Sequence, residues 1–342
     1  MLSSISRQWL LRSRPTGLVG VDDFEYFEAP IPEPGDGDIL VRSLYFGYDA
    51  SQRIWITSDG GYMPRVGIGE PMRTMGIGQV VKSRHPGYRE GDLVMGFLSW
   101  QDYAIARADG PMPLQVLPKA DYPLSWNLNV LGVGGLTAYF AITDVLKVQP
   151  VDTVVISAAS GATGSIAGAV CKTMGVKRVE GIAGGADKCS WLTEQAHYDA
   201  AIDYRSDDLD TRLRELCPEG VDAYLDNVGG DTLDILLGHM VPRGRVAICG
   251  AMASGYTTLD VPGPKKFMNI CTKMLQVKGI LLFYYADRLR AGAETLAHWV
   301  AEGKIPVEEE THEGLEHAPR LLSTLFTGKR PGKLLLKVAD PA

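Results

Sequence analysis

A glycine-containing turn at residues 158–164 carries the clearest chemical signal in the sequence. It reads Ala-Ala-Ser-Gly-Ala-Thr-Gly and lies between an apolar run at residues 153–157 and a helical pattern. Gly161 permits a tight turn and the close approach of a pyrophosphate, Gly164 lets the helix pack against the strand, and the first amides of a helix attract phosphate. Ala159 replaces the first glycine of the usual dinucleotide fingerprint. The pattern predicts a dinucleotide site, and a plain strand–turn–helix corner is the alternative.

The end of the next predicted strand, at residues 178–183, indicates which dinucleotide would bind. An NAD site usually has an Asp or Glu there to hold the ribose 2′-hydroxyl. This chain instead continues with Gly184 and Gly185, and Lys188 follows. A flexible loop that delivers an ammonium group suits a 2′-phosphate, so we predict NADP(H) as the cofactor. The alternative for Lys188 is a solvated residue at the start of a helix.

Two kinds of element surround these residues. Short apolar runs at residues 39–44, 76–81, 92–97 and 102–106 are separated by Gly and Pro, which predicts an antiparallel β-barrel. Further along, apolar runs alternate with helical segments, which predicts a doubly wound parallel sheet of six strands. Those strands are expected at residues 153–157, 178–183, 200–203, 221–226, 245–249 and 278–283.

The predicted fold class is therefore α/β, with a Rossmann-type sheet joined to a smaller β-barrel. A chain of 342 residues is long enough for two cores. We predict a substrate domain at residues 1–127, a nucleotide-binding domain at residues 128–303, and a C-terminal segment at residues 304–342 that returns to the first domain. Helices are expected at residues 286–303 and 315–326.

The bulk properties exclude several classes of function. A net charge of −7 is unfavourable for binding nucleic acid or an anionic membrane, and no apolar run approaches the roughly 20 residues of a membrane span. The first 21 residues hold three arginines and no acid, which faintly resembles a transit peptide. A first β-strand is the favoured interpretation of this segment.

The cysteines have no metal-site spacing, so we expect free thiols and a cytoplasmic protein. The five cysteines are Cys171, Cys189, Cys217, Cys249 and Cys271.

With these motifs the sequence resembles the medium-chain dehydrogenase/reductase superfamily. Within it, the chain is similar to the leukotriene/prostaglandin reductases, the plant alkenal double-bond reductases and the bacterial curcumin reductases, over essentially its whole length. The resemblance implies that the barrel is GroES-like and that the chain forms a homodimer through edge strands of two cofactor-domain sheets. It rests on residues 44–45, 49–53, 135–139, 157–164, 181–189, 226–230, 249–251 and 332–333.

The resemblance also implies a set of cofactor contacts. In such proteins the lysine and a tyrosine, here Lys188 and Tyr204, reach the 2′-phosphate, and the loop after Cys249 borders the nicotinamide. Tyr204 as a strand-end aromatic and Asn227 as a turn former are the structural alternatives. The residues that match the family's contacts are Ser160, Gly161, Ala162, Thr163, Gly164, Lys188, Tyr204, Asn227, Cys249, Gly250, Ala251, Ser254, Ile280, Leu281 and Leu282.

The metal ligands of the superfamily's alcohol dehydrogenases are missing from this sequence. Those enzymes hold zinc through a Gly-His-Glu motif, whereas this chain reads Gly-Ile-Gly-Gln at residues 76–79 and lacks the four-cysteine structural lobe. Zinc needs nitrogen, sulfur or carboxylate donors, so we expect no metal. A hydride acceptor must then already be electron-poor, as an α,β-unsaturated carbonyl is. Hydride would reach the β-carbon, and a tyrosine or water would return a proton to the α-carbon.

A substrate site is expected between the two domains, at the carboxyl ends of the parallel strands. Tyr256 is the candidate proton donor, and a loop aromatic that only covers the cofactor is the alternative. The family usually reads Asp-Pro-Tyr-Met-Arg where this chain has Asp-Ala-Ser-Gln-Arg at residues 49–53, and Arg330 replaces an asparagine. The expected lining, which interdomain packing would also explain, is Tyr48, Ser51, Arg53, Trp55, Tyr256, Phe283 and Tyr284.

The function predicted from the sequence is NADPH-dependent reduction of the C=C bond of enones and enals. Two alternatives stay open at this point. An NADPH-dependent quinone reductase would share the cofactor and would also lack zinc. A non-catalytic NADPH-binding protein would bind the cofactor and turn over neither substrate.

Overall fold

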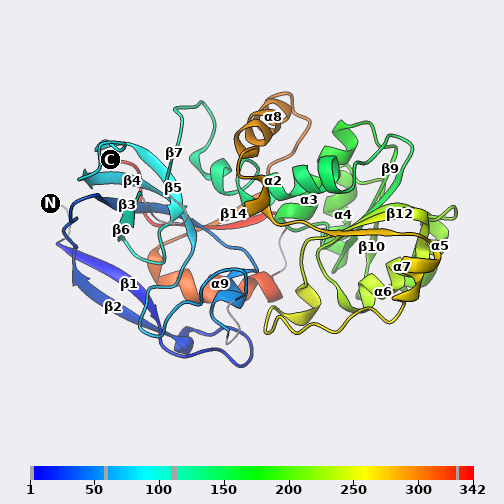
Figure 1. The fold of residues 1–342 in the computed structure, drawn as a ribbon, viewed down its shortest axis with the longest axis horizontal. Helices are drawn as coiled ribbons and strands as arrows, with labels where there is room; N and C mark the ends of the chain where they lie inside the picture. Colours follow the sequence, from blue (N-terminus) through cyan, green and yellow to red (C-terminus); the bar gives the residue numbers. More distant parts are fainter. Residues whose placement is uncertain (1–3, 58–60, 109–113, 329–330) are drawn as a thin grey trace.

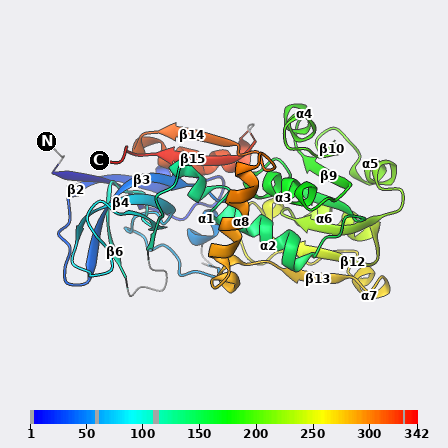
Figure 2. The same cartoon turned by 90° about the horizontal axis from the view of Figure 1, so that it is seen from above.

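The computed structural model describes residues 4–57, 61–108, 114–328 and 331–342. Two lobes lie side by side (Figure 1): one is built on a mainly antiparallel sheet and holds both ends of the described chain, and the other on a parallel sheet. Helix α8 (Leu289–Ala301) lies between the lobes in both ribbon views (Figures 1 and 2). The expected fold class is thereby confirmed.

The parallel sheet has six strands in the order β10-β9-β8-β11-β12-β13. Strands β8, β9 and β10 follow one another outward to one edge of the sheet, and strands β11, β12 and β13 follow one another outward to the other edge. The strand order therefore reverses between β8 and β11, which is where open α/β sheets bind ligands at their carboxyl edge. The strands are β8 (Thr153–Ser157), β9 (Arg178–Ala183), β10 (Ala200–Asp203), β11 (Val221–Asp226), β12 (Met240–Ile248) and β13 (Gln276–Gly279).

Alternate side chains of these strands enter two separate cores. Val154 and Ile156 lie in the core beneath α2 and α3, whereas Val155 lies in the core on the opposite face. Burying such a side chain contributes about 1.5–3 kcal/mol, so both faces must be covered. The covering helices are α2 (Val133–Phe140), α3 (Ala162–Thr173), α4 (Ala186–Glu194), α5 (Leu209–Leu216), α6 (Gly230–His239) and α7 (Met268–Thr272). No helix in the described part of the chain is long and apolar enough to span a membrane.

The last two strands of this sheet differ from the sequence prediction. Strand β12 begins five residues before the expected residue 245, because a register shift against β11 accommodates Pro242 and Gly244 within the strand. Strand β13 ends at Gly279, and Leu282–Tyr285 forms a 3-10 helix where a strand was expected. Because β13 ends at Gly279, residues 280–283 lie outside the sheet at its carboxyl edge.

The other lobe combines strands from both ends of the chain. Its seven-stranded sheet has the order β14-β15-β3-β4-β5-β7, with β6 paired to β3, and every pairing except β14 with β15 is antiparallel. The C-terminal strand β15 thus lies beside β3, and β14 lies beside β15. The domain boundaries after residues 127 and 303 stay a prediction. The elements are β1 (Ile5–Leu11), β2 (Phe24–Pro30), β3 (Asp38–Gly47), α1 (Gln52–Trp55), β4 (Met75–Ser83), β5 (Leu93–Phe97), β6 (Tyr103–Arg107), β7 (Gln115–Val116), β14 (Glu309–Glu313), α9 (Ala318–Thr327) and β15 (Lys333–Lys337).

Two of these elements carry no clear sequence signal. Strand β14 reads Glu-Glu-Thr-His-Glu, so it has no apolar alternation and forms through its backbone pairing with β15. Helix α1 has four residues and directly follows the loop at residues 48–51.

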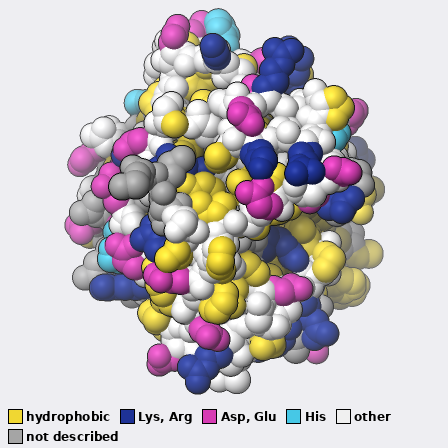
Figure 3. Space-filling view, turned by 90° about the vertical axis from the view of Figure 1, so that its left-hand side faces the viewer, with side chains coloured by type: hydrophobic (Ala, Val, Ile, Leu, Met, Phe, Trp, Pro, Cys, Tyr) yellow, Lys and Arg dark blue, Asp and Glu magenta, His cyan; other side chains and the backbone are white. Residues whose placement is uncertain are grey.

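Figure 3, which views the end of this lobe, shows apolar side chains near the middle of the face and charges of both signs around them.

Candidate functional site

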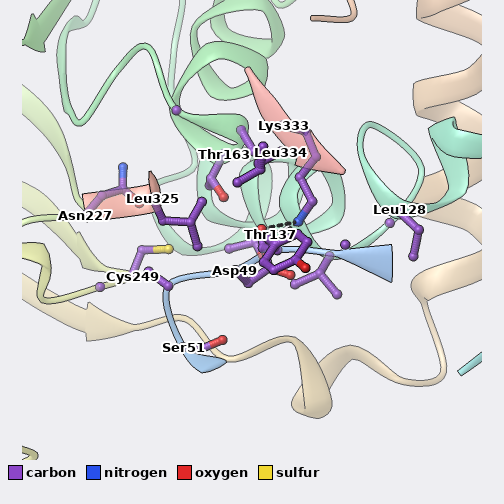
Figure 4. Close-up of a pocket in the computed structure, with 18 of the residues that line it drawn as sticks. Asp49, Ser51, Leu128, Thr137, Thr163, Asn227, Cys249, Leu325, Lys333 and Leu334 are labelled. Carbon is purple, nitrogen blue, oxygen red and sulfur yellow. Dashed lines mark hydrogen bonds and ion pairs between the residues drawn. The ribbon is translucent and has the colours of Figure 1, made fainter. Parts of the chain in front are cut away.

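A cavity of about 2220 Å³ lies between the two lobes and is lined by both of them. Ligand sites for drug-sized molecules measure roughly 300–1,000 Å³, so this cavity has room for a dinucleotide and a substrate together. One lobe contributes the loop at residues 48–51, and the other contributes residues 160–164 and the carboxyl ends of its strands. Figure 4 shows these segments converging on the same space.

The predicted phosphate loop has the geometry that its glycines suggested. Helix α3 begins after Gly161, and no side chain caps its first amides, which leaves them free for an anion. A Cβ at Gly164 would lie 2.5 Å from the oxygen of Ala158 and 2.7 Å from the Cα of Ala159. Only glycine therefore permits this contact between helix and strand. The cavity is lined by Ser160, Gly161, Ala162, Thr163 and Gly164.

Two cations lie near the Gly184–Gly185 turn at the cavity wall. The Nζ of Lys188 donates to the carbonyl of Gly328 at 3.2 Å, and its pKa is lowered by burial and by neighbouring Arg205. The guanidinium of Arg205 lies 5.9 Å from the ring centroid of Tyr204. All three side chains line the cavity, and neither cation forms an ion pair with a carboxylate of the described residues. Such a pair fits a phosphate dianion.

Arg205 is a residue that the sequence analysis missed. The sequence did contain a signal for it, because Arg205 follows β10, the strand that pairs with β9 in the sheet. The backbone nitrogens of Gly185 and Arg205 donate to the Asp203 carboxylate at 2.8 Å and 3.1 Å. Asp203 therefore holds the Gly184–Gly185 turn and the arginine in one arrangement.

Asn227 joins the two halves of the sheet where the strand order reverses. Its Nδ2 donates to the carbonyl of Ser157 at 2.7 Å, and its backbone nitrogen donates to the Ser157 hydroxyl at 2.9 Å. The preceding Asp226 accepts from the hydroxyl of Tyr224 and from the amides of Val228 and Gly229, and burial raises the pKa of its carboxyl. This network fixes the turn after β11 at the cavity wall.

The loop after β12 forms another part of the cavity wall. Cys249 and Gly250 line it, whereas Ala251 and Ser254 are outside the lining. The Ser254 hydroxyl donates to the Ala251 carbonyl at 2.7 Å, so it shapes the loop. Burial raises the pKa of the Cys249 thiol to about 12, which keeps the thiol protonated at neutral pH. Lining residues on the neighbouring segment are Ile280, Leu281 and Leu282.

Tyr256 enters the cavity from the same loop. Gly255 and Tyr256 have φ angles of 61° and 54°, and a positive φ is uncommon for a tyrosine. The Tyr256 hydroxyl accepts a hydrogen bond from the Ala251 amide at 3.0 Å, so its own proton is available for donation. Burial is the main reason why the pKa of Tyr256 rises to about 12. The phenol is therefore protonated and held in place.

Two of the predicted substrate residues donate hydrogen bonds to backbone carbonyls, while the Nη1 of Arg53 is buried without a partner among the described residues. The Tyr48 hydroxyl donates to the carbonyl of Ala318 at 3.0 Å. Arg53, which is 2% exposed, donates to the carbonyls of Pro15 and Gly17 at 2.9 Å and 3.1 Å. Both residues line the cavity, but these contacts favour a packing role for them.

The remaining predicted residues divide between the cavity wall and the surface. Ser51, Trp55 and Phe283 line the cavity, whereas Tyr284 is 84% exposed and is outside the lining. Arg330 lies outside the described residues.

Tyr62 is a second residue that the sequence analysis missed. It lines the cavity, and its ring meets the edge of Phe283 with centroids 5.8 Å apart. Burial raises the pKa of Tyr62, and hydrogen bonding to Ser51 opposes that rise. The stretch around it has neither helical nor strand periodicity, and therefore offered no signal for its placement.

The stretch that holds zinc in related alcohol dehydrogenases is packed against β3 here. A Cβ at Gly78 would lie 2.3 Å from a Val41 methyl carbon and 2.6 Å from the Arg42 oxygen, and Gln79 donates to the Gly91 carbonyl at 3.3 Å. Across the described ranges, no three His, Cys, Asp or Glu side chains are grouped for a metal. The donor set at this position does not fit zinc.

The fold and the cavity define a two-lobed protein with room for a dinucleotide between its lobes. Residues 7–114 match a family described as the N-terminal domain of oxidoreductase, and residues 162–298 match one described as zinc-binding dehydrogenase. NADPH-dependent curcumin reductase of Escherichia coli (strain K12) is 35% identical over 98% of this chain and 97% of its own length. For 2-alkenal reductase (NADP(+)-dependent) of Nicotiana tabacum the identity is 33%, over 98% of each chain.

A solved structure agrees with these sequence relatives. CurA from Vibrio vulnificus in complex with NADPH superimposes with a TM-score of 0.90 at 33% identity, over 98% of this chain and all of the other. The chain therefore belongs to the medium-chain dehydrogenase/reductase superfamily, in the branch of the alkenal and prostaglandin reductases.

Proposed function

We propose that this protein is an NADPH-dependent reductase of the C=C bond in α,β-unsaturated ketones and aldehydes. The observation that carries the proposal is the placement of three features on one cavity: the free amides at the start of α3, the cation pair of Lys188 and Arg205, and the protonated hydroxyl of Tyr256. The relatives named as NADPH-dependent curcumin reductase and 2-alkenal reductase support the same reaction class.

The residues present fit NADPH along the length of the cavity. The amides that follow Gly161 would hold the pyrophosphate, and Lys188 with Arg205 and Tyr204 would hold the 2′-phosphate. The segment at residues 280–282 and Cys249 would border the nicotinamide. When bound, the cofactor supplies the hydride that reaches the β-carbon of the enone.

The protein's own part in the reaction concerns the charge that then develops on the carbonyl oxygen. The Tyr256 hydroxyl has a proton to donate, because its oxygen already accepts from the Ala251 amide. A hydrogen bond from Tyr256 to the carbonyl oxygen of the substrate would stabilise the enolate. The proton that completes the reaction at the α-carbon comes from Tyr256 or from water. Cys249 stays a thiol, which prevents a thiolate in the same cavity from attacking an electrophilic substrate.

A substrate comparison tests the proposed function. Consumption of NADPH should be fast with an aryl enone such as benzylideneacetone and slow with a simple quinone. A large preference for the quinone would favour the quinone reductases of the same superfamily. Binding of NADPH without turnover of either compound would indicate a non-catalytic protein.

We also propose that the reaction is independent of zinc. Treatment of the purified protein with a metal chelator should leave the rate of enone reduction unchanged, because the Gly76–Gln79 stretch is packed and has no ligand set. Elemental analysis should find no stoichiometric zinc. A zinc content near one per chain, with activity lost on chelation, would overturn this part of the proposal.

The exposed edge strand β13 supports the proposal of a homodimer. It is the last strand of its sheet, and Phe267, Met268, Met274 and Val277 are exposed on or beside it. Unpaired strand edges with apolar neighbours favour pairing with a second chain. Val277→Lys should halve the mass measured by sedimentation. The matched control is Val151→Lys, at an exposed valine elsewhere, and an equal loss in both variants would contradict an interface at β13.

A further inference from the structure

Lys333 is a buried lysine to which the proposed reaction assigns no role. It is 1% exposed, although lysines are almost never fully buried unless they are paired. Its Nζ donates to the carbonyl of Tyr48 at 3.0 Å and forms an ion pair with the Asp49 carboxylate at 2.6 Å. Figure 4 shows this pair at the wall of the cavity. Because removing an ammonium group from water is costly, this pairing holds the lysine in one arrangement.

The residue before Lys333 is bonded to the phosphate loop. The amide of Gly332 donates to the carbonyl of Ser160 at 2.9 Å, and Gly332 forms a parallel bridge with Gly161. Gly332 has a φ of 88°, and a Cβ there would lie 2.5 Å from the oxygen of Glu308. Two consecutive residues at the start of β15 therefore reach two different loops of the site.

We propose that Lys333 is a positioning residue that couples cofactor binding at residues 160–164 to the arrangement of the substrate loop at residues 48–51. The inference rests on the proposed function of the cavity. A restraint that a bound cofactor places on Ser160 passes to Gly332 through their hydrogen bond, and from Lys333 to Asp49 through the ion pair. Ser51, which lines the cavity, follows two residues later. Coupling of this kind is reciprocal, so each ligand should tighten the binding of the other.

The affinity for NADPH in the absence and presence of a saturated ketone, the unreactive product, measures this coupling. In the unmodified protein the ketone should tighten NADPH binding by about fivefold or more. In Lys333→Met the affinity for NADPH alone should change by less than about twofold, the tightening by the ketone should disappear, and KM for the enone should rise by about tenfold.

Two further variants keep the test decisive. Lys337→Met removes a lysine of the same strand whose partners, Glu313 and Asp340, lie on the surface, and it should retain the coupling. Asp49→Asn removes the charge with little change in shape, and should lose the coupling even if Lys333→Met fails to fold.

The outcomes separate this inference from the proposed function. Failure of the unmodified protein to reduce any enone would count against the proposed function. With normal turnover, unchanged coupling in both Lys333→Met and Asp49→Asn would overturn the role of Lys333. Loss of affinity for NADPH alone, with the ketone effect intact, would also overturn it, because Lys333 would then belong to the cofactor site.

Discussion

Replacing Lys188 with alanine is expected to weaken NADPH binding by about tenfold to a hundredfold and to leave NADH binding nearly unchanged. The Nζ of Lys188 now donates to a single carbonyl, that of Gly328, and has no carboxylate partner among the described residues. A charge-assisted hydrogen bond to a phosphate contributes about 1.5–3 kcal/mol, and about 1.4 kcal/mol corresponds to a factor of ten. Fluorescence titration with each cofactor measures the two affinities directly.

Two more variants test whether Lys188 and Arg205 act together on the 2′-phosphate. Arg205→Ala should act in the same direction, because its guanidinium lines the same part of the cavity. Lys177→Ala removes an exposed lysine of the same lobe outside the cavity, and should change neither affinity. Equal losses for NADH and NADPH in the Lys188 variant would show that this residue does not bind the 2′-phosphate.

Tyr256→Phe is expected to lower kcat by about tenfold or more while NADPH affinity changes little. The substitution keeps the ring and removes the hydroxyl, whose oxygen accepts from the Ala251 amide and whose proton is free. Because burial raises the pKa of Tyr256 to about 12, the hydroxyl should stay protonated over the neutral range. The rate must be measured where hydride or proton transfer is limiting, which a kinetic isotope effect establishes.

Tyr62→Phe is the matched comparison, since Tyr62 supplies a second hydroxyl to the same cavity. A larger fall in kcat for the Tyr62 variant would transfer the donor role to that residue. An unchanged kcat in both variants would leave water as the source of the proton.

Much of the fold was predictable from local patterns. The six parallel strands are short apolar runs between helices, and alternation within β8 places Val154 and Ile156 on one face and Val155 on the other. The prediction was wrong at β13, because the apolar residues 280–283 form the wall of a cavity instead of extending the strand. Strand β14 could not be found from its charged sequence, since its pairing with β15 and the hydrogen bonds of Glu309 to Ser125 and Asn129 join distant segments.

The candidate site was predictable where it depends on neighbours in sequence. The Gly161–Gly164 turn and Lys188 follow strand ends, so their positions come from the strands themselves. Tyr62 and Lys333 could not be assigned in this way, because their places depend on contacts between distant segments. The partner of Lys333, Asp49, is 284 residues away in the chain. The commitment of Arg53 to the carbonyls of Pro15 and Gly17 is also invisible until the chain has folded.

The measurement that tests the central claim most directly follows the hydride itself. Benzylideneacetone would be reduced with NADPH that carries deuterium at the transferable position, and the product analysed by mass spectrometry and NMR. We predict a saturated ketone with deuterium at the β-carbon and a solvent-derived hydrogen at the α-carbon. Deuterium on the carbonyl carbon of an allylic alcohol, or recovery of unreacted enone, would contradict the account.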